Sequence, residues 1–365
     1  MNEHWFEIKE VESLDTPSLV FFKKRILHNI ETVIQWVNGD VTRLRPHIKT
    51  FKCENILKIL RGYGILKVKT ATITETALAA SAGIPDILMA YQLSNQKIQR
   101  FVDLMLKYPE TRFSTLVDNP HTAYLLNEKS IENQCFIEVF MDVNVGMNRT
   151  GIDYLKAEEF LNFLKTFENL HFRGFHCYDG HLKNKDWRLR TKDCATYFNL
   201  LKGIIEKQTD SEKLEIAAGG SNSFPYYAQN TEGVCCPGTF VLWDDNYTEN
   251  LSEQPFQTAA LLVAQVVSIP QPNHICIDIG YKAVASENPL DKRLRILNYD
   301  NLIPVSHSEE HMVFSHPKDI SIPVGTVIYA LPFHICPTVA LYNEAYVIEN
   351  QEVVDNWEIE NSRKI

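Results

Sequence analysis

The order of the predicted elements is the feature that most constrains how this chain can fold. Between residues 19 and 244, short runs of β-branched or aromatic residues alternate with longer segments of helical periodicity. One such segment is 155–167, where six residues form a single apolar helical face: Leu155, Phe160, Leu161, Phe163, Leu164 and Phe167. The alternation is typical of parallel strands joined by crossover helices, so the sequence predicts an α/β fold.

The number of strand-like runs predicts a barrel. The runs are residues 19–22, 43–49, 67–72, 86–91, 112–117, 136–142, 172–178, 215–219 and 239–244. A (β/α)8 TIM-type barrel closes with eight strands, one fewer than the nine found here. We therefore expect the first run, or the residues just before it, to belong to a different sheet.

The texture of the sequence changes after about residue 250. Valine- and isoleucine-rich runs separated by Pro, Asn and Gly replace the long helices, with candidate strands at 259–269, 274–279, 325–331 and 345–349. This pattern predicts a second, mostly β domain. We expect a barrel of residues 20–248 and a β-rich domain of residues 1–19 together with 249–365.

Composition excludes several classes of protein. Lysine and arginine number 36 against 46 aspartate and glutamate, and the net charge of −10 argues against binding to nucleic acid or an anionic membrane. The most apolar stretch, 259–269, is too short for the roughly 20 residues of a membrane span. The N-terminus lacks the basic-then-apolar order of a secretion signal, and the eight cysteines show no C-x-x-C spacing, so we expect a cytoplasmic protein with reduced thiols.

Three basic residues share one side of the predicted strand 43–49. The period of two along a strand directs Arg45, His47 and Lys49 to the same face. If that face points into the barrel, burial and positive neighbours disfavour the ammonium form of Lys49 and favour a nucleophilic amine. The alternative is a solvated edge strand with ordinary exposed lysines.

Two loops carry further polar groups to the mouth of the barrel. Arg149 follows the run 136–142, and the stretch from Tyr178 to His181 follows the run 172–178, so both belong at the carboxyl end of the strands. His181 is a candidate general base because an imidazole titrates near neutral pH, and Asp179 could orient His181 or bind a substrate. The alternative for Arg149 is an ordinary loop arginine.

Two glycine turns are candidates for a phosphate site. Gly219-Gly220-Ser221 follows the run 215–219, and Pro237-Gly238-Thr239 comes shortly afterwards. Glycines allow backbone N–H groups to approach a phosphate closely, although most such turns only form loops. No G-x-G-x-x-G or P-loop motif is present, so nucleotide binding has no comparable support.

The clearest feature of the tail is the pair His334 and Cys336. Two residues apart on an extended segment, their side chains would project from the same face and could bind one divalent metal. A site with two protein ligands leaves positions open for water or substrate, and a thiolate favours zinc over magnesium or manganese. The alternative is a buried histidine beside an inert cysteine.

The sequence resembles a known family in the stretch Arg45-Pro46-His47-Ile48-Lys49-Thr50, which follows Asp15-Thr16-Pro17-Ser18. This stretch is similar to the D-threonine aldolase and D-serine dehydratase group of pyridoxal-phosphate enzymes, fold-type III relatives of alanine racemase. The resemblance extends from Asp15 to the region of Val353 and implies an alanine racemase-like barrel with a β domain to which the N-terminus contributes. It implies that Lys49 holds the cofactor and that Arg149 lies beside the cofactor ring. The other cofactor-binding residues would be His47, Tyr178, Gly219, Gly220, Ser221, Gly238 and Thr239, with His334 and Cys336 as metal ligands.

The resemblance also implies a reaction. We expect a pyridoxal-phosphate- and divalent-metal-dependent lyase, as a homodimer, acting on small β-hydroxy D-amino acids. The Tyr-Asp-Gly-His stretch resembles the aldolase branch, which cleaves D-threonine to glycine and an aldehyde with a base such as His181. A cysteine at position 336 resembles the His-and-Cys pair of the dehydratase branch, whose members use zinc and form a 2-oxo acid and ammonia. A racemase and a non-catalytic cofactor carrier are further alternatives, but carriers lack the β domain and the His-x-Cys pair.

Overall fold

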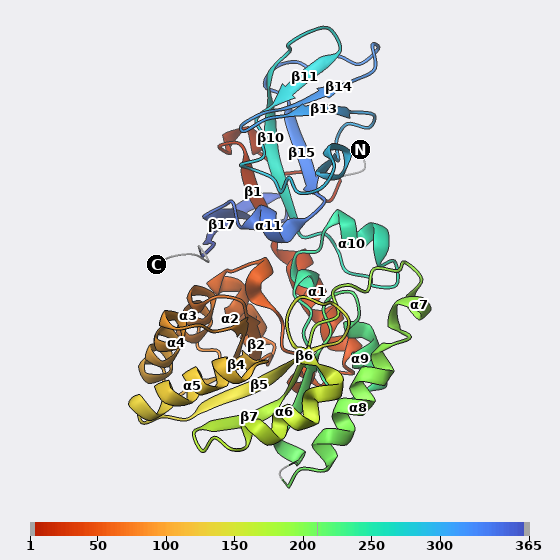
Figure 1. Cartoon of the computed structure of the whole chain (residues 1–365). Helices are drawn as coiled ribbons and strands as arrows, with labels where there is room; N and C mark the ends of the chain where they lie inside the picture. Colours follow the sequence, from red (N-terminus) through yellow and green to blue (C-terminus); the bar gives the residue numbers. More distant parts are fainter. Residues whose placement is uncertain (1–3, 210, 361–365) are drawn as a thin grey trace. The chain divides into compact units, whose positions relative to one another are not determined.

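The computed structural model describes residues 4–209 and 211–360 and divides the chain into two compact units. Of the described residues, one unit takes Val33–Gly238, and the other combines those up to Thr32 with Thr239–Glu360. Helix α1 (Lys23–Trp36) carries the chain from one unit into the other. Figure 1 traces the chain by colour, and each unit is described by itself below.

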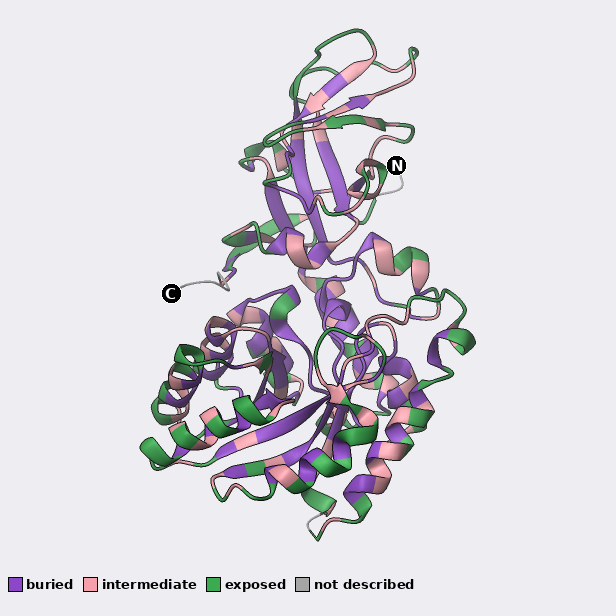
Figure 2. Ribbon diagram, viewed as in Figure 1, coloured by how far each residue is buried: buried purple, intermediate pink, exposed green. Residues whose placement is uncertain are grey.

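The unit Val33–Gly238 is built on a parallel sheet (Figure 1). Within the described residues it has eight strands in the order β2-β3-β4-β5-β7-β8-β9, with β6 paired to β5. Their bounds are β2 (Lys67–Thr70), β3 (Asp86–Gln92), β4 (Arg112–Val117), β5 (Ile137–Asn144), β6 (Ile152–Asp153), β7 (Leu170–Cys177), β8 (Glu215–Ala218) and β9 (Val234–Cys235). The strands are largely buried, as the purple ribbons of Figure 2 show.

The segment before Lys49 closes this sheet into an alanine racemase-like barrel. Leu44 forms a parallel bridge with Cys235 of β9, and His47 forms another with Lys69 of β2. The predicted strand 43–49 is therefore only two isolated bridges between the 3-10 helices η2 (Val41–Arg43) and η3 (Ile48–Thr50). Pro46 explains the break, since it has no N–H to donate to a ladder.

The prediction of a last barrel strand at 239–244 is wrong. Thr239–Val241 forms the 3-10 helix η6, and Trp243 has a φ of 53°, which a strand does not adopt. The strand β9 takes the eighth place in the barrel instead. With only two residues, β9 is too short to be recognised from its sequence pattern.

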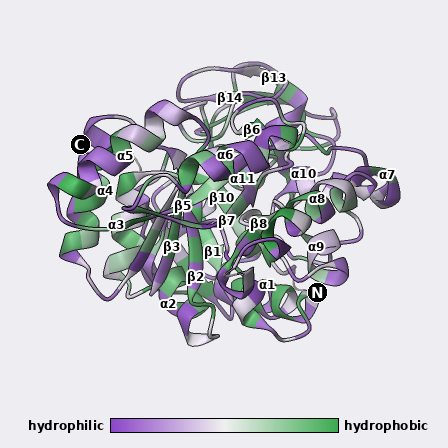
Figure 3. Cartoon of the chain, turned by 60° about the horizontal axis from the view of Figure 1, so that its bottom comes forward, coloured by the Kyte–Doolittle hydropathy of each residue, from purple (hydrophilic) through white to green (hydrophobic). Residues whose placement is uncertain are grey.

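Helices follow the barrel strands, as the α/β prediction requires. They are α2 (Glu54–Gly62), α3 (Ile73–Ser81), α4 (Gln96–Lys107), α5 (Pro120–Glu132), α6 (Ala157–Leu164), α7 (Trp187–Thr191), α8 (Cys194–Glu206) and α9 (Phe224–Asn230), with the 3-10 helices η4 (Tyr154–Lys156) and η5 (Ser211–Lys213). The starts of α3 and α5 are capped, because Thr72 accepts from the Glu75 N–H and Asn119 from the Thr122 N–H. The helices alternate hydrophobic and hydrophilic stretches, as Figure 3 shows.

The predicted apolar face of 155–167 is correct only in its middle. Phe160, Leu161 and Leu164 of α6 are buried, but Leu155 is 70% exposed. Leu155 belongs to η4, whose tighter turn moves it off the α-helical face.

The second unit is a β-rich sheet of nine strands within the described residues. Its main order is β13-β14-β11-β10-β1-β16-β17, while β15 pairs with β10 and β12. The strands are β1 (Ser18–Phe22), β10 (Ala260–Ser268), β11 (His274–Ile277), β12 (Leu294–Ile296), β13 (Ile303–His307), β14 (Met312–Ser315), β15 (Val327–Pro332), β16 (Glu344–Glu349) and β17 (Glu352–Glu358). The remaining elements are η1 (Val11–Ser13), η6 (Thr239–Val241), α10 (Asp245–Asn250), η7 (Leu290–Lys292) and α11 (Ile335–Val339).

Strand β1 confirms that the first predicted run belongs to the β-rich sheet. It pairs antiparallel with β10 and parallel with β16. Val20 and Phe22 pack there against Leu261, Val263 and Ile348 in a buried apolar cluster. Strands β12, β13, β14 and β17 were not predicted. The runs of β12, β13 and β17 include exposed residues, and β14 is only four residues long.

Among the described residues, no helix combines the length and the apolar character needed to cross a membrane.

Candidate functional site

Of the three residues on the predicted basic face, two are buried and Lys49 is not. Arg45 and His47 are 0% and 8% exposed, whereas Lys49 lies in η3 and is exposed. The expected burial of the Lys49 ammonium is therefore wrong, because the chain turns out of the barrel after His47. His47 fixes that turn, since its Nδ1 accepts the backbone N–H of Lys49 at 3.4 Å.

Burial lowers the pKa of His47 well below its usual value, and the neighbouring charge of Lys49 lowers it further. His47 is therefore a neutral imidazole at physiological pH, as an acceptor at Nδ1 must be. The role of His47 that follows from its contacts is to position the backbone of Lys49.

The ring of Tyr178 lies at the centre of the barrel mouth. The Nζ atom of Lys49 is 5.7 Å from the ring centroid, that of Lys69 is 5.8 Å away, and Cζ of Arg149 is 5.0 Å away. These side chains come from η3, from β2 and from the loop after β5. All three positions lie at the carboxyl ends of the barrel strands, which share one side of a parallel barrel. Three of the predicted site residues, Lys49, Arg149 and Tyr178, are thus brought together.

Lys69 is a site residue that sequence reasoning missed. It is 2% exposed, and its Nζ lies 3.4 Å from Nε2 of His176. Nδ1 of His176 lies 2.8 Å from Oδ1 of Asp142, whose Oδ2 accepts a hydrogen bond from Gln92. The signal for Lys69 is a lysine at the carboxyl end of a strand whose neighbours are buried.

The loop that carries Arg149 is held by its own side chains. Oδ1 of Asn144 accepts the N–H groups of Gly146 and Asn148, and the Gly151 N–H donates to Asp118. Gly146 has a φ of 109°, and a Cβ there would lie 2.8 Å from Nε2 of His181. His181 is therefore packed against this loop, and its buried Nδ1 has no hydrogen-bond partner among the described residues.

Asp179 does not orient His181. Its carboxylate is buried and accepts hydrogen bonds from the hydroxyls of Ser223 (2.5 Å) and Tyr227 (3.0 Å) and, at 3.4 Å, from the Gly220 N–H. Asp179 thus ties the end of β7 to the glycine turn after β8. The expectation that it orients His181 is wrong, because these donors already hold the carboxylate.

The glycine turns are places where side chains cannot fit. A Cβ on Gly219 would lie 2.8 Å from Tyr227, one on Gly220 would lie 2.9 Å from the Tyr178 ring, and one on Gly238 would lie 2.7 Å from the carbonyl oxygen of His47. Ser221 is buried beside them. The two turns therefore bring bare backbone up to Tyr178 and to the segment before Lys49.

The predicted metal pair lies in the β-rich unit, at the start of a helix rather than on an extended segment. His334 is the N-cap of α11, and Cys336 lies in its first turn. The His334 ring is hydrogen-bonded to the Cys336 thiol, and its Nδ1 lies 2.5 Å from Oε1 of Glu287. Thr239 joins this group, with its hydroxyl 3.5 Å from the sulfur of Cys336.

The chemistry of this pair fits a divalent metal. A carboxylate on one histidine nitrogen is the common support for a metal on the other. Burial alone would lower the pKa of His334, but the hydrogen bonds to Cys336 and Glu287 outweigh it and raise the pKa to about 9. Among the described residues, no group of three or more His, Cys, Asp or Glu side chains is arranged to hold a metal. A metal bound by only two protein ligands would keep positions open for water or a substrate.

The comparisons with known proteins agree with this architecture. The family model "Alanine racemase, N-terminal domain" matches residues 23–237, which is more than half of the chain, and the model "Putative serine dehydratase domain" matches residues 259–348. The chain belongs to the D-threonine aldolase and D-serine dehydratase-like family, which has the alanine racemase fold. Members of this fold-type III family use pyridoxal phosphate.

Named relatives of this family cover nearly the whole chain. A D-threonine aldolase from Arthrobacter sp is 24% identical over 95% of this chain and 92% of its own length. A D-serine dehydratase from Dictyostelium discoideum is 23% identical over 95% of this chain and 96% of its own. The crystal structure of D-threonine aldolase from Filomicrobium marinum matches with a TM-score of 0.87 at 21% identity, covering 97% of this chain and 96% of that one.

The residues at the barrel mouth fit the family's cofactor. An exposed amine at Lys49 can form a covalent bond to an aldehyde, the Tyr178 ring offers a flat aromatic surface, and Arg149 adds a fixed charge. At the glycine turns a Cβ at any of the three positions would meet an atom within 3 Å, so only bare backbone fits there. Exposed backbone N–H groups of this kind are the donors that phosphate sites use.

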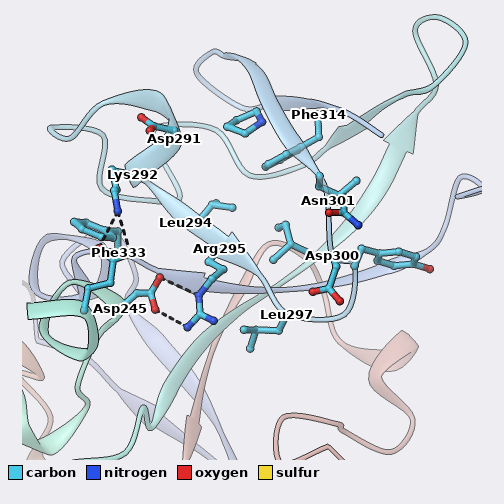
Figure 4. A pocket seen from close by; sticks show the side chains of 15 residues that line it. Asp245, Asp291, Lys292, Leu294, Arg295, Leu297, Asp300, Asn301, Phe314 and Phe333 are labelled. Carbon is cyan, nitrogen blue, oxygen red and sulfur yellow. Dashed lines mark hydrogen bonds and ion pairs between the residues drawn. The ribbon is translucent and has the colours of Figure 1, made fainter. Parts of the chain in front are cut away.

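A cavity of about 370 Å³ lies elsewhere in the β-rich unit, between α10, β12 and β14 (Figure 4). Its charged side chains are paired, Arg295 with Asp245 at 2.5 Å and Lys292 with Glu249 at 2.8 Å. None of the predicted site residues lines it.

Proposed function

We propose that this protein is a pyridoxal-phosphate- and divalent-metal-dependent lyase of β-hydroxy D-amino acids, with D-threonine aldolase as its main activity. The observation that carries the proposal is the group at the barrel mouth, where Lys49 and Arg149 lie within 6 Å of the centre of the Tyr178 ring. The substrate class is supported by the names of the family relatives, an aldolase and a dehydratase of D-amino acids.

In this proposal, Lys49 bonds to the cofactor, Tyr178 and Arg149 contact its ring, and the turns at Gly219-Gly220-Ser221 and Gly238-Thr239 hold its phosphate. His47 positions the backbone of Lys49, because its Nδ1 accepts the hydrogen bond from the Lys49 N–H. Bound pyridoxal phosphate supplies an electron sink for a carbanion at the substrate's α-carbon. The chain's own residues then bind the substrate and move its protons.

His181 is the group proposed to take the proton of the substrate hydroxyl. Its ring is fixed against Gly146, in the loop that also carries Arg149. An imidazole held beside the mouth has a ring nitrogen that can accept a proton and return it later. In the aldolase reaction, loss of this proton accompanies cleavage of the bond between the α- and β-carbons.

His334 and Cys336 are proposed to hold the metal, with Glu287 orienting the imidazole. The thiolate favours zinc, and manganese or magnesium are the alternatives. A metal with open positions would act as a Lewis acid toward the substrate's β-hydroxyl group. A variant of D-threo-3-hydroxyaspartate dehydratase solved in the metal-free form has the same fold as this chain, with a TM-score of 0.77 at 18% identity.

The second candidate is a D-serine or D-threonine dehydratase. The observation that favours it is the cysteine at 336, hydrogen-bonded to His334, since the resemblance to the dehydratase branch rests on a His-and-Cys pair. In that reaction Lys49 removes the α-proton, and the hydroxyl leaves as water. We also propose a homodimer, by analogy with the family.

A product assay with D-threonine tests the proposal. The protein is supplied with pyridoxal phosphate and with zinc or manganese, with a chelated sample and the Lys49→Ala variant as controls. Glycine with acetaldehyde supports the aldolase, and 2-oxobutyrate with ammonia would assign the chain to the dehydratase branch. The absence of both products from a loaded sample, with D-threonine and other β-hydroxy D-amino acids, would contradict the proposal.

A further inference from the structure

Lys69 has surroundings that an ordinary structural lysine does not need. It lies on β2 with 2% of its surface exposed, and its backbone N–H donates to the carbonyl of Pro46. A lysine is almost never buried unless it is paired or functional, because the ammonium loses its hydration. Two residues earlier on the same strand, Lys67 shows the structural case, since it forms an ion pair with Glu215 at 3.0 Å.

The partner of Lys69 is an imidazole. Nζ of Lys69 lies 3.4 Å from Nε2 of His176, and Nδ1 of His176 lies 2.8 Å from Asp142. A carboxylate at Nδ1 fixes the tautomer with the proton on Nδ1, so that Nε2 accepts a hydrogen from Lys69. Asp142 is itself held by Gln92 at 2.7 Å. The Lys69 amine is thus anchored on one side by a hydrogen-bonded chain.

The Lys69 amine also lies near the group that carries the proposed cofactor chemistry, and its charge interacts with that of Lys49. Lys69 and Lys49 approach the Tyr178 ring to nearly the same distance, 5.8 and 5.7 Å. Burial lowers the pKa of Lys69. The titratable groups that face Lys69 from the surrounding elements are His47, Lys49, Asp142, His176, Cys177, Asp179 and Cys236.

The chemistry of pyridoxal phosphate provides a partner for such an amine. Its ring carries an acidic hydroxyl on the carbon next to the one that bears the aldehyde, and the aldehyde is the group that bonds to Lys49. An amine in the neighbourhood of Lys49 is therefore a candidate donor to the oxygen of that hydroxyl. Charge-assisted hydrogen bonds of this kind are stronger than neutral ones.

We propose that Lys69 is a second cofactor-binding amine, which His176 and Asp142 hold in place so that it stabilises the anionic ring oxygen of pyridoxal phosphate bonded to Lys49. The inference rests on the proposed function, because it requires the cofactor at Lys49. It adds a residue outside the predicted site and gives the chain a buried Lys-His-Asp set with a defined task.

The absorption spectrum of the loaded protein tests this proposal, since the near-ultraviolet and visible bands of pyridoxal phosphate report whether its ring oxygen is ionised. We expect Lys69→Met to decrease the band of the ionised form, to change its pH dependence and to weaken cofactor affinity about tenfold. Lys69→Arg keeps the positive charge and should retain most of the wild-type spectrum. Lys67→Met is the matched control and should resemble the wild type.

The outcomes separate this inference from the proposed function. If the loaded wild type and Lys49→Ala have the same spectrum, the cofactor is not on Lys49 and both proposals are wrong. If the wild type is loaded at Lys49 and Lys69→Met has the same spectrum, pH profile and affinity, only the inference is overturned. Should Lys69→Met fail to fold, His176→Gln removes the imidazole and should change the spectrum in the same direction. A wild-type spectrum of that variant would overturn the inference.

Discussion

At the scale of single residues, the positions of Arg149 and Tyr178 after two predicted strands, together with the motif around Lys49, predicted which side chains meet at the barrel mouth. Lys49, Arg149 and Tyr178 converge there as expected. Lys69 was not predicted, because its place at the carboxyl end of a buried strand does not show which partners its amine has. Its partner His176 comes from a strand 107 residues away, and only the folded barrel brings the two together.

In the proposed metal site, the metal preference depends on the ligand atom of residue 336. Cys336→Asp replaces a soft thiolate by a carboxylate, which favours manganese over zinc. We therefore expect the ratio of the activity with manganese to the activity with zinc to increase about tenfold. Activity titrations of the chelated protein with each metal measure this ratio. Cys135→Asp, at a half-buried cysteine outside the pair, is the control. An unchanged ratio would argue against Cys336 as a ligand.

The loop that carries Arg149 depends on a glycine. Gly146→Ala would place a methyl group 2.8 Å from His181 and would force a side chain into a φ of 109°. If His181 is the proton acceptor, kcat should decrease about tenfold or more while cofactor affinity remains close to that of the wild type. Steady-state kinetics and a cofactor titration separate the two effects. A loss of cofactor affinity alone would contradict this role of His181.

At the scale of the elements, the alternating pattern predicted the α/β barrel and the β-rich sheet, and the strands that it missed have physical reasons. Pro46 interrupts the segment before Lys49, and β9 has only two residues. Two isolated bridges and a two-residue strand therefore close the barrel, and no hydrophobic period can reveal such short pairings. The strands β13 and β17 carry many exposed residues, so they lack the buried alternation used to recognise a strand.

The turn at Gly238 is where the barrel comes close to the segment before Lys49. A Cβ in Gly238→Ala would lie 2.7 Å from the carbonyl oxygen of His47, so the backbone must shift. We expect the dissociation constant for pyridoxal phosphate to increase about tenfold, since about 1.4 kcal/mol corresponds to a factor of ten. Fluorescence or absorption titration measures it. Gly203→Ala, in open space on α8, should bind like the wild type, and equal affinity of the two variants would contradict the assignment of this turn.

At the scale of the whole molecule, a network of buried ion pairs occupies the end of the barrel opposite the mouth. Arg45 and Arg173 are buried there between carboxylates, with Arg45 2.7 Å from Asp86 and 2.6 Å from Glu215. Arg45 was predicted to share the face of His47 and Lys49, and its burial follows from that pattern. Its partners could not be predicted, because they come from β3 and β8.

This network should make the fold sensitive to acid. Despite burial, which would raise it, the pKa of Asp86 is strongly lowered, because Arg45 and Arg173 favour its ionised form. A lowered pKa stabilises the fold at every pH above the usual carboxyl value of about 4, and this stabilisation is lost as the pH falls toward the folded-state value. We expect Asp86→Asn to destabilise the protein by about 3 to 5 kcal/mol at pH 7 and by less in acid.

Denaturant unfolding at a series of pH values measures this difference. Asp103→Asn changes an exposed carboxylate on α4 and should have little effect at any pH. A difference between Asp86→Asn and the wild type that stays constant from neutral pH to strongly acidic pH would contradict the electrostatic origin of the stabilisation.

The most direct test of the whole account is the site of covalent attachment of the cofactor. The protein is incubated with pyridoxal phosphate, reduced with borohydride, digested and analysed by mass spectrometry. The account predicts that the cofactor mass is found on the peptide containing Lys49, that Lys49→Ala abolishes it, and that Lys69→Met retains it. Attachment at Lys69 or at a surface lysine in the wild type would contradict the assignment of Lys49 and the proposed function built on it.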